Sequence, residues 1–464
     1  MYIPGQAGLS GPLLASAPRE AGLVAAVGGA IDAAHTPRTR YSAPILLGLV
    51  MLFDSWDVSC IAYVMPSLVK EWGLQPITIG SIISAGYAGQ FVGAILMGAL
   101  AEKFGRFRVL FPAIILMALM SLACAAVTGV QQLMIARFAQ GLLIGGALPV
   151  SATYINEIAP TQNRGRYFGL FQTIGIFGYT CSSFASIVVI PWGGWRWMFG
   201  LGALPLLAVP FMPFFLPESP RWLARSGDLP VINRALARLG GKPLGASYAG
   251  MESGHIITQK IPVSALFAGD YRSRTIVVVL LWFTTTFISL GLTGWVPTIY
   301  TSVYHYQIGE ALHFTAIFSV LYIIGMPLTF LLIDWFGRRR PAIIMMGVSA
   351  ISLTILGLIP QPPTILLVSM VIAGHWSCGQ VTVILWPYSA EIYPTRMRAL
   401  AVGFVSSFAR GASMITPMVV GLVIAETGSI KPMFLVFGVS AATGFVLWLK
   451  ASRETAGVSL DDIR

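Results

Sequence analysis

Glu102-Lys-Phe-Gly-Arg-Phe-Arg108 follows one long apolar run, and Asp334-Trp-Phe-Gly-Arg-Arg-Arg340 follows another in the second half of the chain. A second pair of loop strings, Glu157-Ile-Ala-Pro-Thr-Gln-Asn-Arg164 and Glu391-Ile-Tyr-Pro-Thr-Arg-Met-Arg398, repeats with nearly the same separation in the sequence. Because two motifs recurring at nearly one offset are hard to explain by chance, they predict a chain built from two parallel copies of one unit.

The sequence around these motifs is strongly apolar. Hydrophobic residues make up 56% of the 464 residues and charged residues only 10%, whereas soluble domains carry about 25% charged residues. Apolar runs of about 18 residues or more indicate membrane-spanning helices. The predicted fold class is therefore an all-α integral membrane protein with twelve transmembrane helices. We expect them at 42–66, 79–101, 108–129, 131–154, 166–190, 197–216, 275–300, 312–333, 341–360, 364–388, 399–423 and 431–450.

The loops divide the chain into two bundles and three polar segments. A polar stretch separates the sixth predicted helix from the seventh, and the N-terminal segment is rich in Ala, Gly and Pro without a signal-peptide pattern. The expected units are a flexible cytoplasmic tail at 1–40, an N-terminal six-helix bundle at 41–223, a cytoplasmic central loop at 224–274, a C-terminal six-helix bundle at 275–450 and a cytoplasmic tail at 451–464.

The basic residues predict the orientation. The formal charge of +11 could suggest a nucleic-acid partner, but Lys and Arg lie in short loops between apolar runs, which fits the anionic cytoplasmic leaflet better. One side of the predicted membrane holds 24 of the 29 basic residues, and the other holds only Lys70, Arg196 and Lys431. The positive-inside rule therefore places both termini in the cytoplasm. Arg137 and Arg410 remain, and both lie within predicted spans.

Metal and cofactor chemistry are not expected. Cys60, Cys124, Cys181 and Cys378 are widely spaced inside apolar runs, so we interpret them as small buried hydrophobic residues rather than metal ligands or disulfide partners. The sequence also contains no phosphate loop, nucleophile elbow or metal-ligand cluster. An enzyme is therefore the least expected class.

The repeated loop motifs have a physical logic as gates. An acidic residue at a helix end can pair with Arg residues and with a neighbouring helix terminus, and Gly105 permits a tight turn between them. Such clusters could hold the cytoplasmic side closed and release it as the halves move, or they could serve only as topology signals. We expect Glu157 and Glu391 to form gate or structural pairs beside Arg164 and Arg398. The complete set of gate or latch residues is Glu102, Arg106, Glu157, Arg164, Asp334, Arg338, Glu391 and Arg398.

Four charged residues lie well away from the ends of the predicted spans, where each costs about 2.5–3.5 kcal/mol at the bilayer centre and usually marks a transport pathway. Asp54 and Asp57 are three residues apart and share a helix face. We expect Asp57 to pair with Arg137 and one of the two Asp residues to carry a proton; a static packing pair is the alternative. Arg410 has no obvious acid in its own half, so we expect its planar guanidinium to bind a substrate carboxylate. The alternative for Arg410 is satisfaction by helix carbonyls.

Other residues in the spans could contact the substrate. His375 could hydrogen-bond it or take up a proton. The rings of Trp282, Phe287, Trp376 and Trp386 could stack on an aromatic substrate, although aromatic residues are common in membrane helices and ordinary packing is the first explanation for any single ring. The candidate substrate-binding residues are Arg410, Asp54, Trp282, Phe287, His375, Trp376, Gln380 and Tyr179, and the candidate proton-coupling residues are Asp54, Asp57 and Arg137.

Several of these strings resemble a known superfamily. The loop that ends at Arg108 resembles the signature loop of the major facilitator superfamily, with Glu102 where the family usually has Asp. Pro217-Glu-Ser-Pro-Arg-Trp-Leu223 resembles the matching string of sugar porters, organic-ion transporters and metabolite:proton symporters. Phe53-Asp-Ser-Trp-Asp57 and Phe408-Ala-Arg-Gly411 look most like niacin and aromatic-acid:proton symporters, and Gly269-Asp-Tyr-Arg272 is similar to the niacin group.

Some positions depart from these branches. Ala147 stands where niacin transporters commonly have Glu, and Gln172 stands where an acid is expected, so both positions count against the niacin branch more than against the aromatic-acid branch. Phe283-Thr-Thr-Thr-Phe287 lacks the Gln-rich motif of sugar porters. Gly175-Ile-Phe-Gly178 lacks the Pro of drug:proton antiporters.

The resemblance implies a major facilitator fold and a function. It indicates a proton-coupled secondary transporter that imports a small organic anion, such as nicotinate or a benzoate-type acid, by alternating access between two six-helix bundles. We expect a multi-pass monomer in the inner (plasma) membrane whose partners are the organic anion, protons and the lipid bilayer, with no nucleic acid. A sugar or polyol:proton symporter is the alternative, and a non-transporting membrane receptor or scaffold is the alternative of another class.

Overall fold

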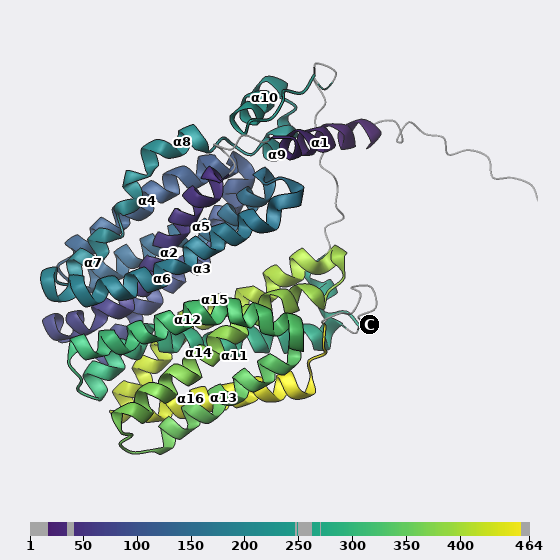
Figure 1. Ribbon diagram of the computed structural model, residues 1–464. Coiled ribbons are helices and arrows are strands. Elements are labelled where there is room, and N and C mark those ends of the chain that lie inside the picture. The colour runs from purple at the N-terminus through teal and green to yellow at the C-terminus, as the bar shows by residue number, and fades with distance from the viewer. Residues whose placement is uncertain (1–16, 35–40, 246–247, 249–261, 270, 456–464) are drawn as a thin grey trace, which may run out of the picture.

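Two helical bundles lie side by side in the computed structural model (Figure 1), which describes residues 17–34, 41–245, 248, 262–269 and 271–455. Twelve helical spans in these residues are long and apolar enough to cross a membrane, as the sequence predicted. The first bundle contains α2 (Ser42–Trp72), α3 (Pro76–Phe104), α4 (Arg106–Ala126), α5 (Val130–Ile158), α6 (Arg164–Gly193) and the span that begins with α7 (Trp195–Leu201). The second contains α11 (Tyr271–Thr298), α12 (Ile308–Phe336), α13 (Arg339–Leu358), α14 (Thr364–Glu391), α15 (Thr395–Thr427) and α16 (Lys431–Lys450).

The sixth span is not one regular helix. After α7 the chain continues through two short 3-10 turns, Leu204–Leu207 and Val209–Phe211, before α8 (Met212–Phe215). Pro205, Pro210 and Pro213 explain the interruption, because each lacks a backbone N–H and clashes with the preceding turn of an α-helix.

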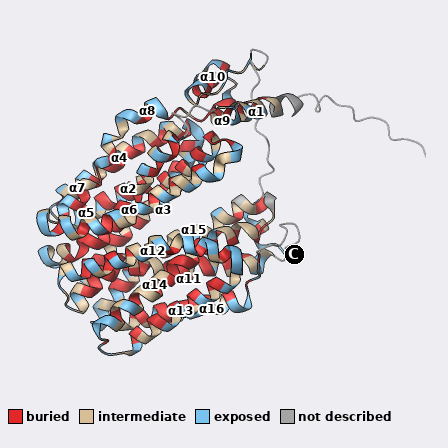
Figure 2. Ribbon diagram, in the orientation of Figure 1, coloured by how far each residue is buried: buried red, intermediate tan, exposed pale blue. Residues whose placement is uncertain are grey.

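Burial follows the membrane environment. Buried residues concentrate inside the bundles and where they meet, whereas large apolar side chains are exposed on the outer faces (Figure 2). Ile135 and Val188 are examples, with exposed fractions of 70% and 69%. In lipid this pattern is favourable, because a helix pairs all its backbone polar groups internally and exposes only apolar side chains.

The two bundles meet most closely at the end opposite α1, α9 and α10 (Figure 1). There α3 of the first bundle packs against α15 of the second. A Cβ atom added to Gly80 would overlap the carbonyl oxygen of Pro417, and one added to Gly421 would overlap the carbonyl oxygen of Pro76. Because glycine lacks a side chain, the two backbones touch directly, and the bundles are closed at this end.

Part of the predicted N-terminal tail is helical. Residues 17–32 form helix α1 (Ala17–Asp32), which packs through Leu23, Val27 and Ile31 on the segment that follows the sixth span. That segment contains α9 (Pro220–Leu223) and α10 (Leu229–Arg238). The carboxylate of Asp32 accepts hydrogen bonds from the backbone N–H (2.6 Å) and hydroxyl (3.0 Å) of Thr161. The N-terminal segment expected as a tail thus contains a helix at 17–32, while residues 1–16, 35–40 and 456–464 lie outside the described part of the chain.

Candidate functional site

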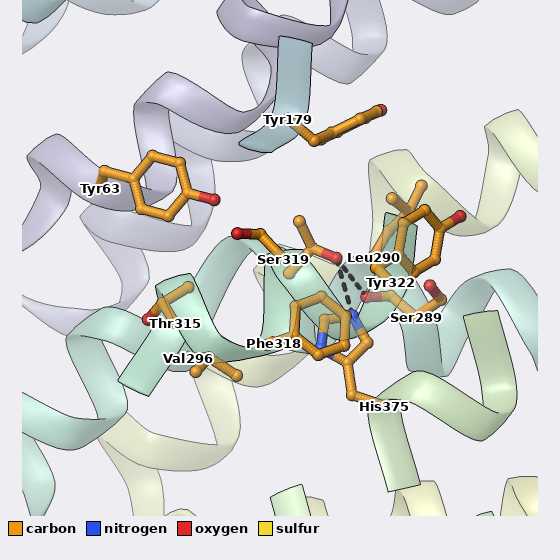
Figure 3. A pocket seen from close by; sticks show the side chains of 11 residues that line it. Tyr63, Tyr179, Ser289, Leu290, Val296, Thr315, Phe318, Ser319, Tyr322 and His375 are labelled. Atoms are coloured by element: carbon orange, nitrogen blue, oxygen red, sulfur yellow. Dashed lines mark hydrogen bonds between the residues drawn. The ribbon is translucent and has the colours of Figure 1, made fainter. Parts of the chain in front are cut away.

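A cavity opens between the two bundles, with an empty volume of ≈ 670 Å³ that includes its solvent-open part. The first bundle contributes Tyr63 from α2 and Tyr179 from α6, and the opposite wall comes from α11, α12 and α14 (Figure 3). This second wall consists of Ser289, Leu290, Thr293, Val296, Thr315, Phe318, Ser319, Tyr322 and His375. The cavity is therefore rich in aromatic rings and hydroxyl groups, and no Lys, Arg, Asp or Glu is among its lining residues.

His375 is held in a fixed orientation in this wall. Its ring stacks on Phe318, with the ring centroids 4.0 Å apart and the planes tilted by only 8°. Its Nε2 atom lies 2.9 Å from the hydroxyl oxygen of Thr293, and that hydroxyl also contacts the carbonyl oxygen of Ser289 at 2.8 Å (Figure 3). The stack and the hydrogen bond together fix the ring of His375 in the cavity wall.

The structure brings two of the predicted substrate contacts, His375 and Tyr179, to the cavity wall. The other predicted aromatic and amide groups are occupied in helix packing. Trp282 donates from Nε1 to the hydroxyl of Ser389 (2.9 Å), and the ring of Phe287 packs edge to face on Phe437 of α16, with the centroids 5.5 Å apart. Trp376 donates to the carbonyl of Leu321 (2.9 Å), and Gln380 accepts a hydrogen bond from Thr329 (2.8 Å). Trp282, Phe287, Trp376 and Gln380 therefore join helices in this conformation.

Asp54 lies close to the cavity wall, whereas Arg410 lies outside it. Asp54 is 6% exposed and its Oδ1 atom has no hydrogen-bond partner among the described residues. Its carboxyl group lies within electrostatic range of the hydroxyl of Tyr179 at the cavity wall. Arg410 is half-buried on α15 and does not line the cavity, and no acid within the described residues forms a salt bridge with it.

Asp57 lies in a closed polar network inside the first bundle. Ser121 donates its hydroxyl to the Asp57 carboxylate, with oxygen–oxygen distances of 3.1 and 3.2 Å. Arg137 donates to the main-chain carbonyl of Asp57 (3.1 Å) and to the Oε1 atom of Gln140 (2.7 Å). Arg137 is thus a neighbour of Asp57, as expected, but within the described residues no salt bridge joins their side chains.

The repeated loop motif of the first bundle forms an ion-pair cluster. The guanidinium of Arg106 binds Glu157 (2.9 Å) and Glu102 (2.7 Å), and Glu102 also binds Arg225 (2.5 Å). The carboxylate of Glu218 accepts hydrogen bonds from three successive backbone N–H groups at the start of α4, those of residues 106, 107 and 108, at 2.7–3.1 Å. An anion at a helix N-terminus is favourable because it satisfies unpaired donors and the helix dipole.

The second bundle repeats this cluster. Arg338 binds Glu391 (2.8 Å) and lies 3.9 Å from Asp334. Glu454 accepts from the backbone N–H groups of Arg338 (2.8 Å) and Arg339 (3.1 Å). Glu454 is therefore the counterpart of Glu218, and the two are separated in the sequence by nearly the same offset as the other two motif pairs.

Glu157 and Glu391 each bind an Arg from the first repeated loop motif of their own half. Glu157 binds Arg106 rather than Arg164, and Glu391 binds Arg338. The reason is geometric, because α4 and α13 begin beside the ends of α5 and α14 and deliver these Arg side chains to the carboxylates. These ion pairs of each cluster, all between described residues, lie within one half of the chain.

Sequence reasoning overlooked most of the cavity wall. Thr315, Phe318, Ser319 and Tyr322 have the spacing of one helix face in the apolar run of α12, which was the available signal. Their hydroxyls were not singled out because uncharged groups carry a smaller insertion cost than Asp or Arg. Glu218 belongs to a motif that the sequence analysis quotes, but its counterpart in the second half, Glu454, was missed.

The sequence matches a known family of transporters over most of its length. The model of the family described as "Sugar (and other) transporter" matches residues 46–464. The chain belongs to this family of the major facilitator superfamily. Its twelve spans and its family make it a multi-pass plasma-membrane transporter.

The relatives of this chain include a niacin transporter and a gallate transporter. A niacin transporter of Acinetobacter baylyi is 28% identical, with 91% of this chain and 96% of the relative covered. A gallate transporter of Pseudomonas putida is 30% identical, with 86% and 88% covered. Among solved structures, the E. coli xylose transporter XylE in a partially occluded inward-open conformation matches with a TM-score of 0.72 and 21% identity, covering 91% of this chain and all of that one. This last likeness supports the fold alone.

Proposed function

We propose that this transporter imports a small aromatic monocarboxylate together with a proton, by alternating access. The observation that carries the proposal is the cavity between the halves, whose aromatic surface combines the His375–Phe318 stack of the second bundle with Tyr63 and Tyr179 of the first. A planar ring can stack on such a surface, and the surrounding hydroxyls can bind its polar substituents. The carriers of niacin and gallate among the relatives support this substrate class.

The proposed proton site is the Asp54 and Asp57 pair of α2. Asp57 is fully buried and Asp54 is 6% exposed, so a charged carboxylate at either position is costly unless it is compensated. Binding of a proton removes that charge. One proton and one monoanion cross together without net charge, so the substrate-loaded carrier can reorient across the membrane potential at low cost.

Arg410 is the proposed partner of the substrate carboxylate. Its guanidinium is half-buried, and the described residues supply no acid that neutralises it. Since Arg410 lies outside the cavity wall in this conformation, the carboxylate would meet it as the halves change their relative position. We further propose that the protein works as a monomer with both termini in the cytoplasm.

Uptake into proteoliposomes tests the proposal. Radiolabelled nicotinate, 4-hydroxybenzoate, gallate and xylose are offered to purified protein with and without an inwardly directed proton gradient. We expect gradient-driven accumulation of at least one aromatic acid, without a substrate-induced current. We also expect Arg410→Ala to raise the apparent KM by about tenfold or more, because an Arg–carboxylate pair is lost. Uptake with wild-type KM in that variant would remove Arg410 from the site.

A sugar:proton symporter is the second candidate. The hydroxyl-rich cavity wall could equally bind the hydroxyls of a sugar, and XylE shares the fold. Accumulation of xylose with no uptake of the three aromatic acids would select this candidate. Absence of gradient-driven flux for a broad set of organic acids and sugars would favour a receptor or scaffold.

A further inference from the structure

A buried chain of hydrogen bonds runs from Arg137 to the carboxylate of Asp57 through two neutral side chains. Arg137 donates to Gln140 Oε1 (2.7 Å), and Gln140 Nε2 donates to the hydroxyl oxygen of Ser121 (2.7 Å). Ser121 in turn donates to the Asp57 carboxylate (3.1 Å). All four residues are at most 3% exposed, so water does not compete for these bonds.

The hydrogen bonds of this chain all have the same direction. Every donor points toward Asp57, so the arrangement fits a carboxylate that only accepts hydrogen bonds. If Asp57 binds a proton, its neutral carboxyl group accepts the Ser121 hydrogen bond more weakly than the carboxylate does, and its new O–H becomes a donor that needs an acceptor of its own. The bond between Ser121 and Gln140 then weakens, and so does the hold of Gln140 on Arg137.

Arg137 also touches the helix that meets the other half. A Cβ atom added to Gly86 of α3 would lie 3.2 Å from a terminal nitrogen of Arg137. The same helix packs against α15 through Gly80. Furthermore, the Nε atom of Arg137 is buried without a hydrogen-bond partner among the described residues, so the guanidinium has a donor left for a second arrangement.

The charged and titratable groups around Asp57 and Arg137 come from several helices. Arg137 (α5) is a charged group that faces Asp57 from another helix, and Cys124 (α4) and Tyr87 (α3) are titratable groups within electrostatic range of Arg137. On α2 itself, Asp54 and Cys60 lie nearby. The segment after α7 closes the network, since a Cβ atom added to Gly202 would lie 2.7 Å from Asp57 Oδ1 and 2.9 Å from the Ser121 hydroxyl oxygen.

We propose that Ser121 and Gln140 are positioning residues that transmit the protonation state of Asp57 to Arg137 and, through Arg137, to α3 at the junction of the two halves. The inference rests on the proposed proton coupling at Asp57. No proton travels along the chain. The proton binds to and leaves the Asp57 carboxylate, and the chain reports its presence by a change of hydrogen-bond pattern.

The first test compares two kinds of transport in proteoliposomes, using whichever of radiolabelled nicotinate, 4-hydroxybenzoate or gallate the wild type accumulates. Ser121→Ala and Gln140→Leu each interrupt the chain of hydrogen bonds. Net uptake driven by a proton gradient should fall about tenfold, because a buried hydrogen bond to a charged group is lost. Exchange of internal for external substrate, which needs no release of the proton, should stay within about twofold of wild type. A matched control is Ser182→Ala, which alters a buried serine whose hydroxyl has no partner among the described residues.

The second test needs no substrate. Spin labels at Gln75→Cys and Glu426→Cys, in a Cys181→Ser background, report the distance between α3 and α15 at the junction. We expect this distance distribution to change with pH in wild type and in Ser182→Ala, and to become independent of pH in Asp57→Asn, Ser121→Ala and Gln140→Leu. Ser121→Thr, which keeps the hydroxyl, should restore the response.

Several results would overturn the inference. One is wild-type net uptake in both Ser121→Ala and Gln140→Leu. Another is an equal loss of uptake and exchange with the pH response of the labels intact, which indicates only a structural role. If the wild type transports none of the acids, the proposed function fails separately, and the label distances alone decide whether the chain acts as stated.

Discussion

The contact between Gly80 and Pro417 offers a direct test of how the halves close. In Gly80→Ala the new Cβ atom would overlap the carbonyl oxygen of Pro417 and lie 3.0 Å from its carbonyl carbon and 3.1 Å from Cα of Met418. These neighbours are backbone atoms of a regular helix, so they cannot turn aside as a flexible side chain could. The helices α3 and α15 must therefore separate, or the closed arrangement must be abandoned.

The size of the effect follows from this overlap. Forcing extra volume into a packed contact costs about 1–3 kcal/mol. Because about 1.4 kcal/mol corresponds to a tenfold change in an equilibrium constant, a cost of about 2 kcal/mol lowers the population of the closed arrangement about 30-fold relative to the open one. The gain in helix propensity on replacing Gly by Ala, about 1 kcal/mol, acts on both arrangements and cancels.

The assay is the distance between spin labels at Gln75→Cys and Glu426→Cys, together with uptake in proteoliposomes. Gly80→Ala should add a longer-distance population and slow uptake, because the transport cycle needs both arrangements. Gly98→Ala on the same helix is the matched control, since an added Cβ there meets nothing within 4 Å. Identical distance distributions and uptake rates in Gly80→Ala and Gly98→Ala would refute the reasoning.

Two further predictions concern the helix cap and the cavity. Glu218→Gln removes the charge that accepts three backbone N–H bonds at the start of α4, so the free energy of unfolding should fall by about 1–3 kcal/mol, seen as a lower Tm in detergent. Glu426→Gln is the exposed control, and an equal Tm in both would contradict the cap. His375→Ala should raise the KM for an aromatic acid about tenfold with little change in kcat, while His375→Phe, which keeps the stack, should lose less. Equal KM values in His375→Ala and the exposed control His313→Ala would exclude this surface from the site.

Much of the architecture could be predicted from sequence because the signals are local. A long apolar run must form a helix in lipid, so all twelve spans were predicted correctly. The repeated loop motifs likewise predicted the two six-helix units. The broken sixth span was missed, although Pro205, Pro210 and Pro213 are visible in the sequence, because apolar composition alone does not register a helix break.

The candidate site was only partly predictable. Charged residues inside the apolar runs drew attention to Asp54, Asp57, Arg137 and Arg410, since their insertion cost is large. Their partners could not be predicted, because a residue spacing does not determine which side chains from other helices approach. The clearest case is the link between Asp57 and Arg137, which the neutral side chains of Ser121 and Gln140 form.

The sequence by itself determined the membrane class, the number of spans and the internal repeat, because hydrophobic run length and motif spacing are properties of the chain alone. Only the tertiary structure decided that Arg106 and Arg338 bind Glu157 and Glu391, that Ser121 and Gln140 link Asp57 to Arg137, and that a cavity of aromatic and hydroxyl groups lies between the halves. These features bring together side chains from helices far apart in sequence. Their contacts depend on how the helices pack and rotate, which close approaches such as that of Gly80 on Pro417 determine.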